Sequence, residues 1–117
     1  MKKVNLIVPC YNEAEALPLF KDELNKVIQT LDQYTFEILL INDGSTDTTL
    51  SVMKEICDTD SHYKYISFSR NFGKEAAMYA GFCNSDGDYA AIMDADMQDP
   101  PALLPDMLHC LETEDYD

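Results

Sequence analysis

The C-terminal part of this sequence lacks lysine and arginine. The 117 residues include 8 Lys or Arg against 22 Asp or Glu, which gives a formal net charge of -14. The last basic residue is Lys74, and the segment from Glu75 to Asp117 contains 11 acidic residues and no Lys or Arg. Such a surface repels the phosphates of nucleic acids, so we expect no nucleic-acid partner. It also repels a nucleoside diphosphate unless a cation lies between them.

Several sequence signatures are missing as well. No apolar run approaches the ~20 residues that a membrane helix needs. The four cysteines form no C-x-x-C pair, so we expect neither a zinc site nor disulfides, and we interpret them as reduced and mostly buried. The apolar run at residues 4–8 is too short for a signal peptide and no small-residue cleavage site follows it. We therefore expect one domain in the cytoplasm.

What the sequence does contain is an alternation of strand-like and helix-like segments. Short apolar runs that end at turn residues predict strands, and apolar residues at helical spacing predict helices. The predicted strands are residues 3–8, 36–41, 63–68 and 89–93; the predicted helices are residues 17–31, a helix that Ser45 or Asp47 caps and that runs to about residue 57, residues 73–83 and residues 103–111. Because strands that alternate with helices need crossover connections, we expect a three-layer α/β/α fold with a mainly parallel sheet.

The most informative segment follows the fourth predicted strand, where an apolar run leads into Asp94-Ala95-Asp96-Met97-Gln98-Asp99-Pro100-Pro101. Two prolines cannot continue a strand inside a sheet. The carboxylates are therefore expected at the carboxyl end of the strand, where open α/β sheets bind ligands. Two carboxylates at i and i+2 on a strand share a face, and the pair needs a cation or a proton. A divalent ion with oxygen ligands meets that need, and two acids in a solvated turn are the alternative.

The other three predicted strands also end in polar groups. After the first strand, Tyr11 can stack on a base or ribose while Asn12 and Glu13 accept its hydrogen bonds. After the second, Asp43 can accept from a ring N–H of a nucleobase, and Arg70, after the third, suits a diphosphate at a helix N-terminus. The structural alternatives are Asn12 as a helix cap, Asp43 in an Asx-turn, and a cap with surface cations. A single bound nucleotide explains all four strand ends together.

Four ordered motifs carry a resemblance to a known family. They are Val8-Pro9-Cys10-Tyr11-Asn12-Glu13, Asn42-Asp43-Gly44-Ser45-Thr46-Asp47, Ser69-Arg70-Asn71-Phe72-Gly73-Lys74 and Asp94-Ala95-Asp96-Met97-Gln98-Asp99-Pro100-Pro101. With these motifs the chain resembles the inverting family 2 glycosyltransferases, and most closely the polyprenyl-phosphate branch that includes dolichol-phosphate mannose synthase. The resemblance implies a GT-A fold, a nucleotide-diphosphate sugar donor, and Mg²⁺ or Mn²⁺ as cofactor.

The resemblance also implies roles for residues that match the family motifs. The base and ribose pocket would be lined by Pro9, Tyr11, Glu13 and Asp43. The metal that bridges the diphosphate would be held by Asp94, Asp96 and Gln98. Two cations would lie near the phosphates: Arg70 and Lys74. The acceptor would be a polyprenyl phosphate at the cytoplasmic face of the membrane, and this anionic acceptor needs little help from a general base.

The same resemblance limits what residues 1–117 are expected to do. They correspond to the nucleotide-sugar-binding part of a GT-A domain without its acceptor half, so we expect no turnover from these residues alone. A truncated sheet edge invites pairing, which leaves a homodimer open.

Three other functions compete with the transferase. A non-catalytic nucleotide-sugar-binding or assembly module is the main one, since the acceptor half is missing. A dinucleotide-binding dehydrogenase is disfavoured because no G-x-G-x-x-G follows the first predicted strand. A phospho-acceptor signalling domain would carry its acids after the first and third strands, whereas here they follow the second and the fourth.

Overall fold

The computed structural model describes residues 2–96 and 101–113, and it confirms the alternation of strands and helices. Its elements, in chain order, are β1 (Lys2–Cys10), α1 (Ala16–Ile28), β2 (Tyr34–Asn42), α2 (Thr49–Thr59), β3 (Tyr63–Ser67), α3 (Lys74–Cys83), β4 (Tyr89–Ile92), the 3₁₀ helix η1 (Pro101–Leu103) and α4 (Leu104–Thr113).

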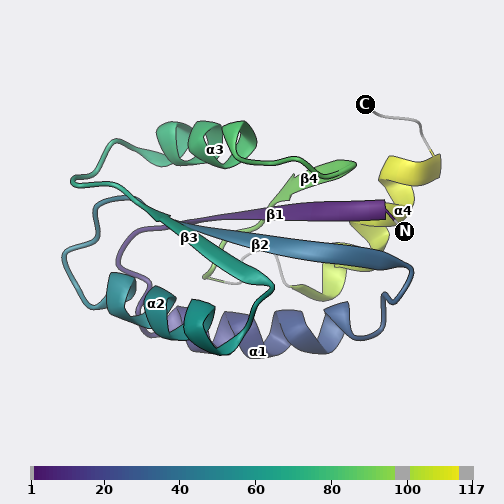
Figure 1. The fold of residues 1–117 in the computed structure, drawn as a ribbon, viewed down its shortest axis with the longest axis horizontal. Coiled ribbons are helices and arrows are strands. Elements are labelled where there is room, and N and C mark those ends of the chain that lie inside the picture. Colours follow the sequence, from purple (N-terminus) through teal and green to yellow (C-terminus); the bar gives the residue numbers. More distant parts are fainter. Residues whose placement is uncertain (1, 97–100, 114–117) are drawn as a thin grey trace.

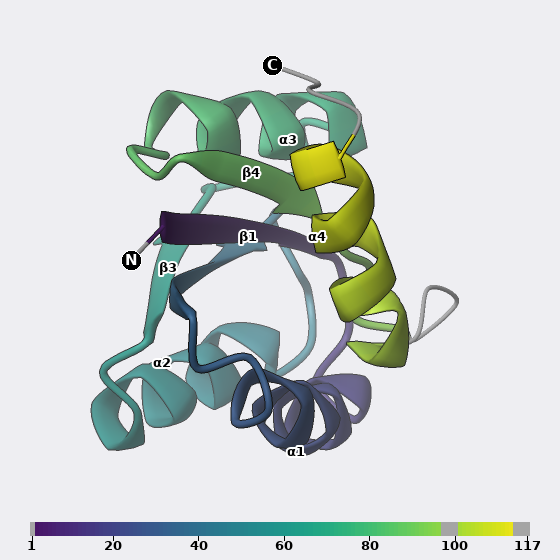
Figure 2. The same ribbon diagram turned by 90° about the vertical axis from the view of Figure 1, so that its right-hand side faces the viewer.

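The four strands form one parallel sheet in the order β3-β2-β1-β4. Helices α1 and α2 cover one face of this sheet and α3 covers the other (Figure 1). The predicted α/β fold with three layers is therefore confirmed. Helix α4 runs along the side of the molecule from near α1 to the level of β4 and beyond (Figure 2), and its buried Leu104 and Leu108 join the same core as α1. None of the helices in residues 2–96 and 101–113 is long and apolar enough to cross a membrane.

Strand β1 has apolar residues on both faces because helices cover both sides of the sheet. Val4, Leu6 and Val8 pack into the core under α1 and α2, while Ile7 packs on the α3 side with a second, smaller cluster. This two-sided burial explains why the strand reads as a continuous apolar run rather than an alternating one. In α1, apolar side chains recur at helical spacing and face the larger core; the buried ones are Leu17, Phe20 and Leu24.

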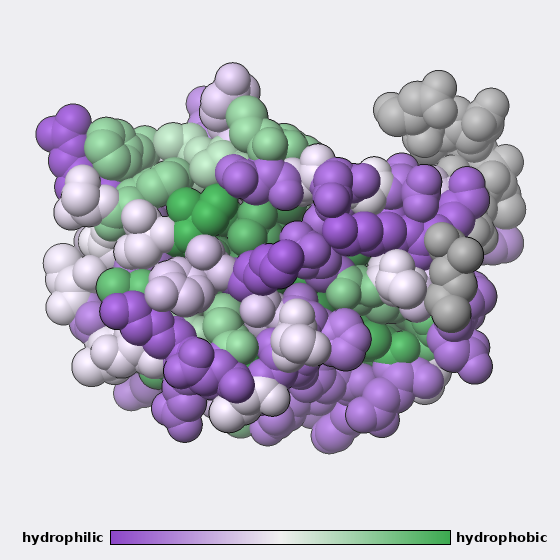
Figure 3. All heavy atoms as spheres, viewed as in Figure 1, coloured by the Kyte–Doolittle hydropathy of each residue, from purple (hydrophilic) through white to green (hydrophobic). Residues whose placement is uncertain are grey.

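The α3 side of the sheet is covered more thinly. Helix α3 is the only helix of the described residues on this face, and three aromatic side chains are exposed there, Tyr79 and Phe82 on the helix and Phe72 just before it. Figure 3 shows hydrophobic residues gathered on the α3 side and hydrophilic residues over α1 and α2. On this view of the molecule, the exposed apolar surface therefore lies mainly on the α3 side.

Three predicted helix boundaries are wrong. Helix α2 begins at Thr49, and neither Ser45 nor Asp47 is its N-cap, since the cap position is Thr48 and makes no side-chain cap bond. The Ser45 hydroxyl instead accepts the N–H of Asn12, and the Asp47 carboxylate accepts the N–H of Thr49. The Ser45 hydroxyl thus binds another loop, whereas Asp47, one position before the cap, still accepts an N–H of the first turn of α2.

The other two errors concern α1. This helix starts at Ala16, so Asn12 does not cap it. It ends at Ile28, although the predicted helix runs to Leu31. Leu31 is buried, but it lies in a tight turn in which its N–H donates to the Ile28 carbonyl. At this position the apolar spacing indicated a buried side chain and not a helical backbone.

The four cysteines are all free, as predicted, but they are less buried than predicted. Cys10 is buried and Cys57 is half-buried, whereas Cys83 and Cys110 are exposed on α3 and α4. Burial raises the pKa of the Cys57 thiol to about 11, so this thiol is protonated at neutral pH.

A glycine sets the distance between α3 and the sheet. A Cβ at Gly81 would overlap the Cγ2 methyl of Ile7, although Ala is favoured over Gly inside a helix by about 1 kcal/mol. We expect the overlap to dominate, so that Gly81→Ala lowers the free energy of unfolding by about 1–3 kcal/mol in urea denaturation. In an Ile7→Ala background, which removes the overlapping methyl group, the same substitution should be neutral or stabilising. Equal losses in both backgrounds would contradict this packing.

Candidate functional site

A pocket of about 170 Å³ opens at the carboxyl edge of the sheet. It is lined by residues from the ends of β1, β2 and β4 and from the start of α3, namely Pro9, Cys10, Tyr11, Glu13, Asp43, Lys74 and Asp94. Six of these seven residues were predicted as site residues from the sequence. Parallel pairing explains the convergence, because all four strands deliver their carboxyl ends to the same edge.

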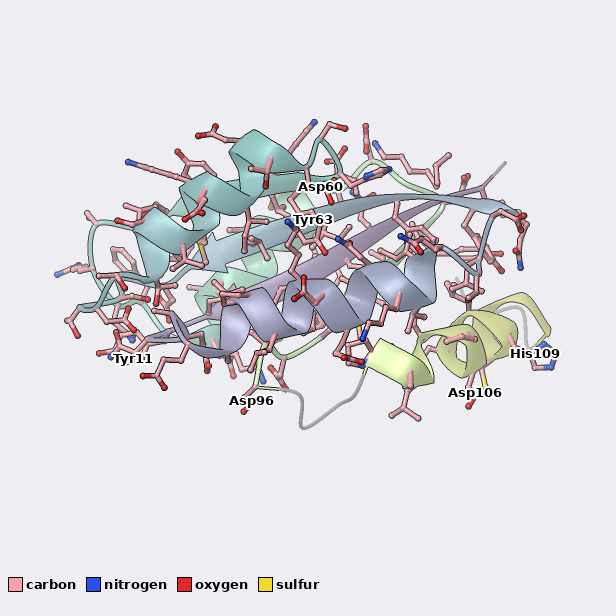
Figure 4. The ribbon with its side chains drawn as sticks, turned by 90° about the horizontal axis from the view of Figure 1, so that it is seen from below. Tyr11, Asp60, Tyr63, Asp96, Asp106 and His109 are labelled. Carbon is pink, nitrogen blue, oxygen red and sulfur yellow. The ribbon has the colours of Figure 1, made fainter. Side chains whose placement is uncertain are left out.

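The remaining predicted residues lie outside the pocket lining. Arg70 is exposed, and its guanidinium carbon lies 4.7 Å from the centre of the Phe72 ring. Asp96 is exposed as well, and Figure 4 shows it toward the end of the molecule that carries Tyr11, away from His109 at the far end of α4. Gln98, the predicted third metal ligand, lies outside the described residues.

The two carboxylates of the acid-x-acid motif follow β4 rather than lying on it. The strand ends at Ile92, and Asp94 is half-buried while Asp96 is exposed, on either side of the buried Ala95. The prediction that they share one face of a strand is therefore wrong in its geometry. The expectation that negative charge gathers at this edge is better supported, because acidic residues surround Glu13 there.

The pKa of the Glu13 carboxyl reflects these acidic neighbours. Its own burial raises the pKa of the Glu13 carboxyl, and the negative charges of Asp96, Asp47 and Asp94 raise it further, in that order. A carboxyl whose pKa is raised by neighbouring carboxylates lies in a region that a cation would stabilise. The negative charges of three other acids therefore act on Glu13 at the edge where the sequence predicted a cation.

Lys74 supplies a positive charge at this position. Its Nζ atom lies 2.8 Å from Oδ1 of Asp94, so the predicted phosphate-binding cation pairs with a predicted metal ligand. Lys74 is also the first residue of α3, where the helix dipole disfavours a cation. Its position is therefore supported by the carboxylates across the pocket rather than by its own helix.

Asp94 and Asp96 are chemically suited to a divalent ion that would share its coordination with a ligand. Within residues 2–96 and 101–113, no group of three or more His, Cys, Asp or Glu side chains is arranged to hold a metal ion. Asp94 and Asp96 supply hard oxygen ligands, which Mg²⁺ and Mn²⁺ prefer. Mg²⁺ is commonly bound by one or two carboxylates together with substrate phosphates. Two aspartates beside a phosphate-sized pocket match that arrangement better than an all-protein cage.

Asp43 is buried, and its carboxylate is hydrogen-bonded to another loop. Oδ1 accepts the N–H of Phe72 at 2.8 Å and Oδ2 accepts the N–H of Gly73 at 3.1 Å. The predicted Asx-turn alternative belongs to its neighbour, since the Asn42 side chain accepts the N–H of Ser45. Each carboxylate oxygen has a second lone pair, so Asp43 still presents an acceptor to the pocket that it lines.

Gly44 holds the same two loops in contact. Its φ is +67°, and a Cβ there would overlap the Arg70–Asn71 peptide. Only glycine meets both requirements, the left-handed backbone and the close approach. The Asn-Asp-Gly-Ser turn therefore packs against the loop that opens α3, a contact that the sequence motif did not predict.

Cys10 lines the pocket without a predicted role. It is buried, its thiol donates to the Val8 carbonyl at 3.3 Å, and burial raises its pKa well above the usual range. A thiol in that state is a poor nucleophile.

Comparison with known proteins identifies the family. The sequence model of the family described as glycosyl transferase family 2 matches residues 5–117. The chain belongs to that family. CsbB of Bacillus subtilis (strain 168), whose name describes a glycosyltransferase, is 46% identical over 114 residues, which are 97% of this chain and 34% of CsbB. The bactoprenol glucosyl transferase of Shigella phage SfV is 41% identical over 106 residues, 91% of this chain and 34% of that enzyme. The family 2 chain thus spans about a third of these relatives.

Solved structures confirm the fold. The mannosyltransferase PcManGT from Pyrobaculum calidifontis, solved in complex with GDP-Man and Mn²⁺, superimposes with a TM-score of 0.79 at 24% sequence identity. The match covers 94% of this family 2 chain and 32% of PcManGT. The described residues therefore have the fold of part of a GT-A glycosyltransferase, as the motifs implied.

Removing the charge of Asp43 tests its structural role. Asp43→Asn turns one acceptor oxygen into an NH₂ group that faces a backbone N–H, so we expect a loss of about 1–3 kcal/mol in the free energy of unfolding without ligand. Asp88→Asn is the matched control, because the Asp88 carboxylate accepts a single N–H, from Lys3, at an exposed site. Urea denaturation should show little change for the control. Equal effects of the two substitutions would argue against the buried anchor at Asp43.

Proposed function

We propose that residues 1–117 are the nucleotide-sugar-binding part of an inverting, metal-dependent glycosyltransferase that transfers a hexose from a UDP- or GDP-sugar to a polyprenyl phosphate. The observation that carries this proposal is the pocket at the carboxyl edge, which joins groups suited to a base and ribose with Lys74, suited to a diphosphate, and Asp94, suited to its metal. The bactoprenol glucosyl transferase among the relatives supports the lipid-phosphate acceptor.

Each wall of the pocket has a role in this proposal. The base and ribose would contact the walls from β1 and β2, formed by Pro9, Tyr11, Glu13 and Asp43. The diphosphate would lie toward the N-terminus of α3, with Lys74 and, from the preceding loop, Arg70. Mg²⁺ or Mn²⁺ would be held by Asp94, Asp96 and Gln98. An acidic chain then binds an anionic donor because cations separate the two.

The proposed sugar transfer requires that the departing nucleoside diphosphate be stabilised. A bound divalent ion neutralises the charge that develops on it as the sugar–phosphate bond breaks. The protein's own contribution is orientation: Tyr11 stacks on the base or ribose, and Lys74 with the N–H groups at the start of α3 faces the phosphates. A lipid phosphate is already anionic and attacks without a strong general base. Its place is the cytoplasmic face of the membrane, where the complete enzyme would meet it.

Donor binding with its metal dependence tests the proposal. We expect calorimetric titration of the complete protein to show binding of UDP-glucose or GDP-mannose with Mn²⁺, and Asp96→Ala to abolish the metal-dependent part because one anionic ligand is lost. Asp32→Ala removes a similarly exposed charge before the amino end of β2, away from the pocket, and should leave binding unchanged. Absence of binding by the wild type with either sugar and any metal would refute the proposal.

A transfer assay separates the enzyme from a binding module. The complete protein should move labelled sugar from the bound donor to added polyprenyl phosphate. Donor binding without any transfer would favour a non-catalytic nucleotide-sugar-binding module instead.

Replacing Lys74 should change the affinity for the metal and the affinity for the donor in opposite directions. In Lys74→Met the ammonium no longer competes for Asp94, so Mn²⁺ alone should bind about two- to fivefold more tightly. The nucleotide sugar with Mn²⁺ should bind about tenfold more weakly, because a charge-assisted contact to phosphate is lost. Lys64→Met, which removes a lysine paired with Glu37 at 3.5 Å, is the control and should change neither constant. Weaker binding of both Mn²⁺ and the nucleotide sugar by Lys74→Met would contradict a competition between Lys74 and Mn²⁺ for Asp94.

A further inference from the structure

Asn12 has an unusual backbone conformation between two pocket residues. Its φ is +54°, and among the described residues it is the only one other than glycine with a positive φ. An L-residue pays a steric penalty there, and asparagine is one of the few that tolerate it. The left-handed turn separates Tyr11 from Glu13, and both of these neighbours line the pocket.

The side chain of Asn12 binds the loop that follows β2. Its Oδ1 atom accepts the N–H of Thr46 at 2.8 Å, the N–H of Asp47 at 3.3 Å and the hydroxyl of Thr46 at 3.3 Å. In return, its backbone N–H donates to the Ser45 hydroxyl at 2.9 Å. We call this reciprocal set of bonds, between Asn12 and residues 45–47, the Asn12 clamp.

The Asn12 clamp joins the two walls of the proposed base and ribose pocket. One wall, from the β1–α1 loop, carries Tyr11 and Glu13, and the other, from the β2–α2 loop, carries Asp43. The Glu13 N–H donates to the Thr49 hydroxyl at 2.9 Å, which extends the contact to the start of α2. The spacing of the walls is therefore set by hydrogen bonds between segments more than thirty residues apart in the sequence.

We propose that Asn12 is a positioning residue for the donor pocket, which acts by holding the β1–α1 and β2–α2 loops at the spacing that a nucleotide requires. This inference rests on the proposed function. Two properties of asparagine are needed together, tolerance of the left-handed backbone and an amide oxygen that accepts several bonds. Glycine offers only the first, and alanine offers neither.

The clamp lies on the surface, which separates its role from that of core packing. Its bonds join exposed loop residues, so its loss should loosen these loops locally while the core keeps the sheet folded. Asn25 provides a matched control away from the pocket. Its side chain accepts the Tyr63 hydroxyl at 2.9 Å and donates to Asp60 at 3.4 Å, joining α1 to the start of β3. Figure 4 shows Asp60 and Tyr63 well separated from Tyr11.

The experiment compares Asn12→Ala, Asn12→Gly and Asn12→Asp with Asn25→Ala in the complete protein. Amide hydrogen exchange at Thr46 and Asp47 reads the clamp directly, and titration with UDP-glucose or GDP-mannose and Mn²⁺ reads the pocket. We expect Asn12→Ala and Asn12→Gly to exchange faster at both amides and to raise the Kd and KM for the donor about tenfold, with kcat changed less than about twofold. Asn12→Asp keeps an acceptor and tolerates the backbone, so it should stay within about threefold of the wild type.

Asn25→Ala should lower the melting temperature without changing the donor Kd or the exchange of Thr46 and Asp47. Donor binding by Asn12→Gly equal to the wild type would overturn the proposal, as would equal effects of the alanine substitutions at 12 and 25 on Kd. A wild-type protein that binds no nucleotide sugar overturns the proposed function and this inference together. Wild-type binding that the Asn12 variants retain overturns this inference alone.

Discussion

The parallel pairing of β1 with both of its neighbours is the constraint on which the site depends. Cys10 of β1 pairs with Asn42 of β2, and Ile7 of β1 pairs with Ile92 of β4. This register brings the residues that follow each strand out at one edge, so Tyr11, Asp43 and Asp94 line one pocket although they are far apart in the sequence. A slip of one residue would turn the apolar side chains of β1 to the wrong faces, and the two cores therefore fix the geometry of the pocket.

Charge decides what such a pocket can hold. The acids gathered around Glu13 raise its pKa, and Lys74 is the only basic residue among those that line the pocket in the described part of the chain. An anionic donor meets repulsion from the acids unless they are neutralised, whereas the acids and Lys74 already neutralise one another in part. If a metal and a diphosphate bind together, the ion pair between Lys74 and Asp94 would be replaced by two others, one between Asp94 and the metal and one between Lys74 and the diphosphate. The proposed dependence of donor binding on metal would then be a property of the pocket as a whole.

The sequence predicted the elements and the strand-end residues because both depend on local patterns. Apolar runs with polar ends located all four strands, and six predicted residues line the pocket. The sequence did not predict how those residues are held, because their partners are distant along the chain: the carboxylate of Asp43 binds the N–H groups of Phe72 and Gly73. The helix-cap errors at Ser45 and Asn12 have the same origin, since each side chain that suits a cap bonds instead to the other loop.

These long-range bonds connect the loops of the carboxyl edge into one rim. Asn12 joins the β1–α1 loop to the β2–α2 loop, and Asp43 joins the β2–α2 loop to the start of α3, where Lys74 faces Asp94. Hydrogen bonds of this kind are individually weak, but each one restricts a loop that the next depends on. A pocket built in this way is ordered before a ligand arrives, so less of the binding free energy is lost in ordering it. If the proposed function holds, residues between the ligand-facing positions, such as Asn12, would contribute to binding by holding this rim together.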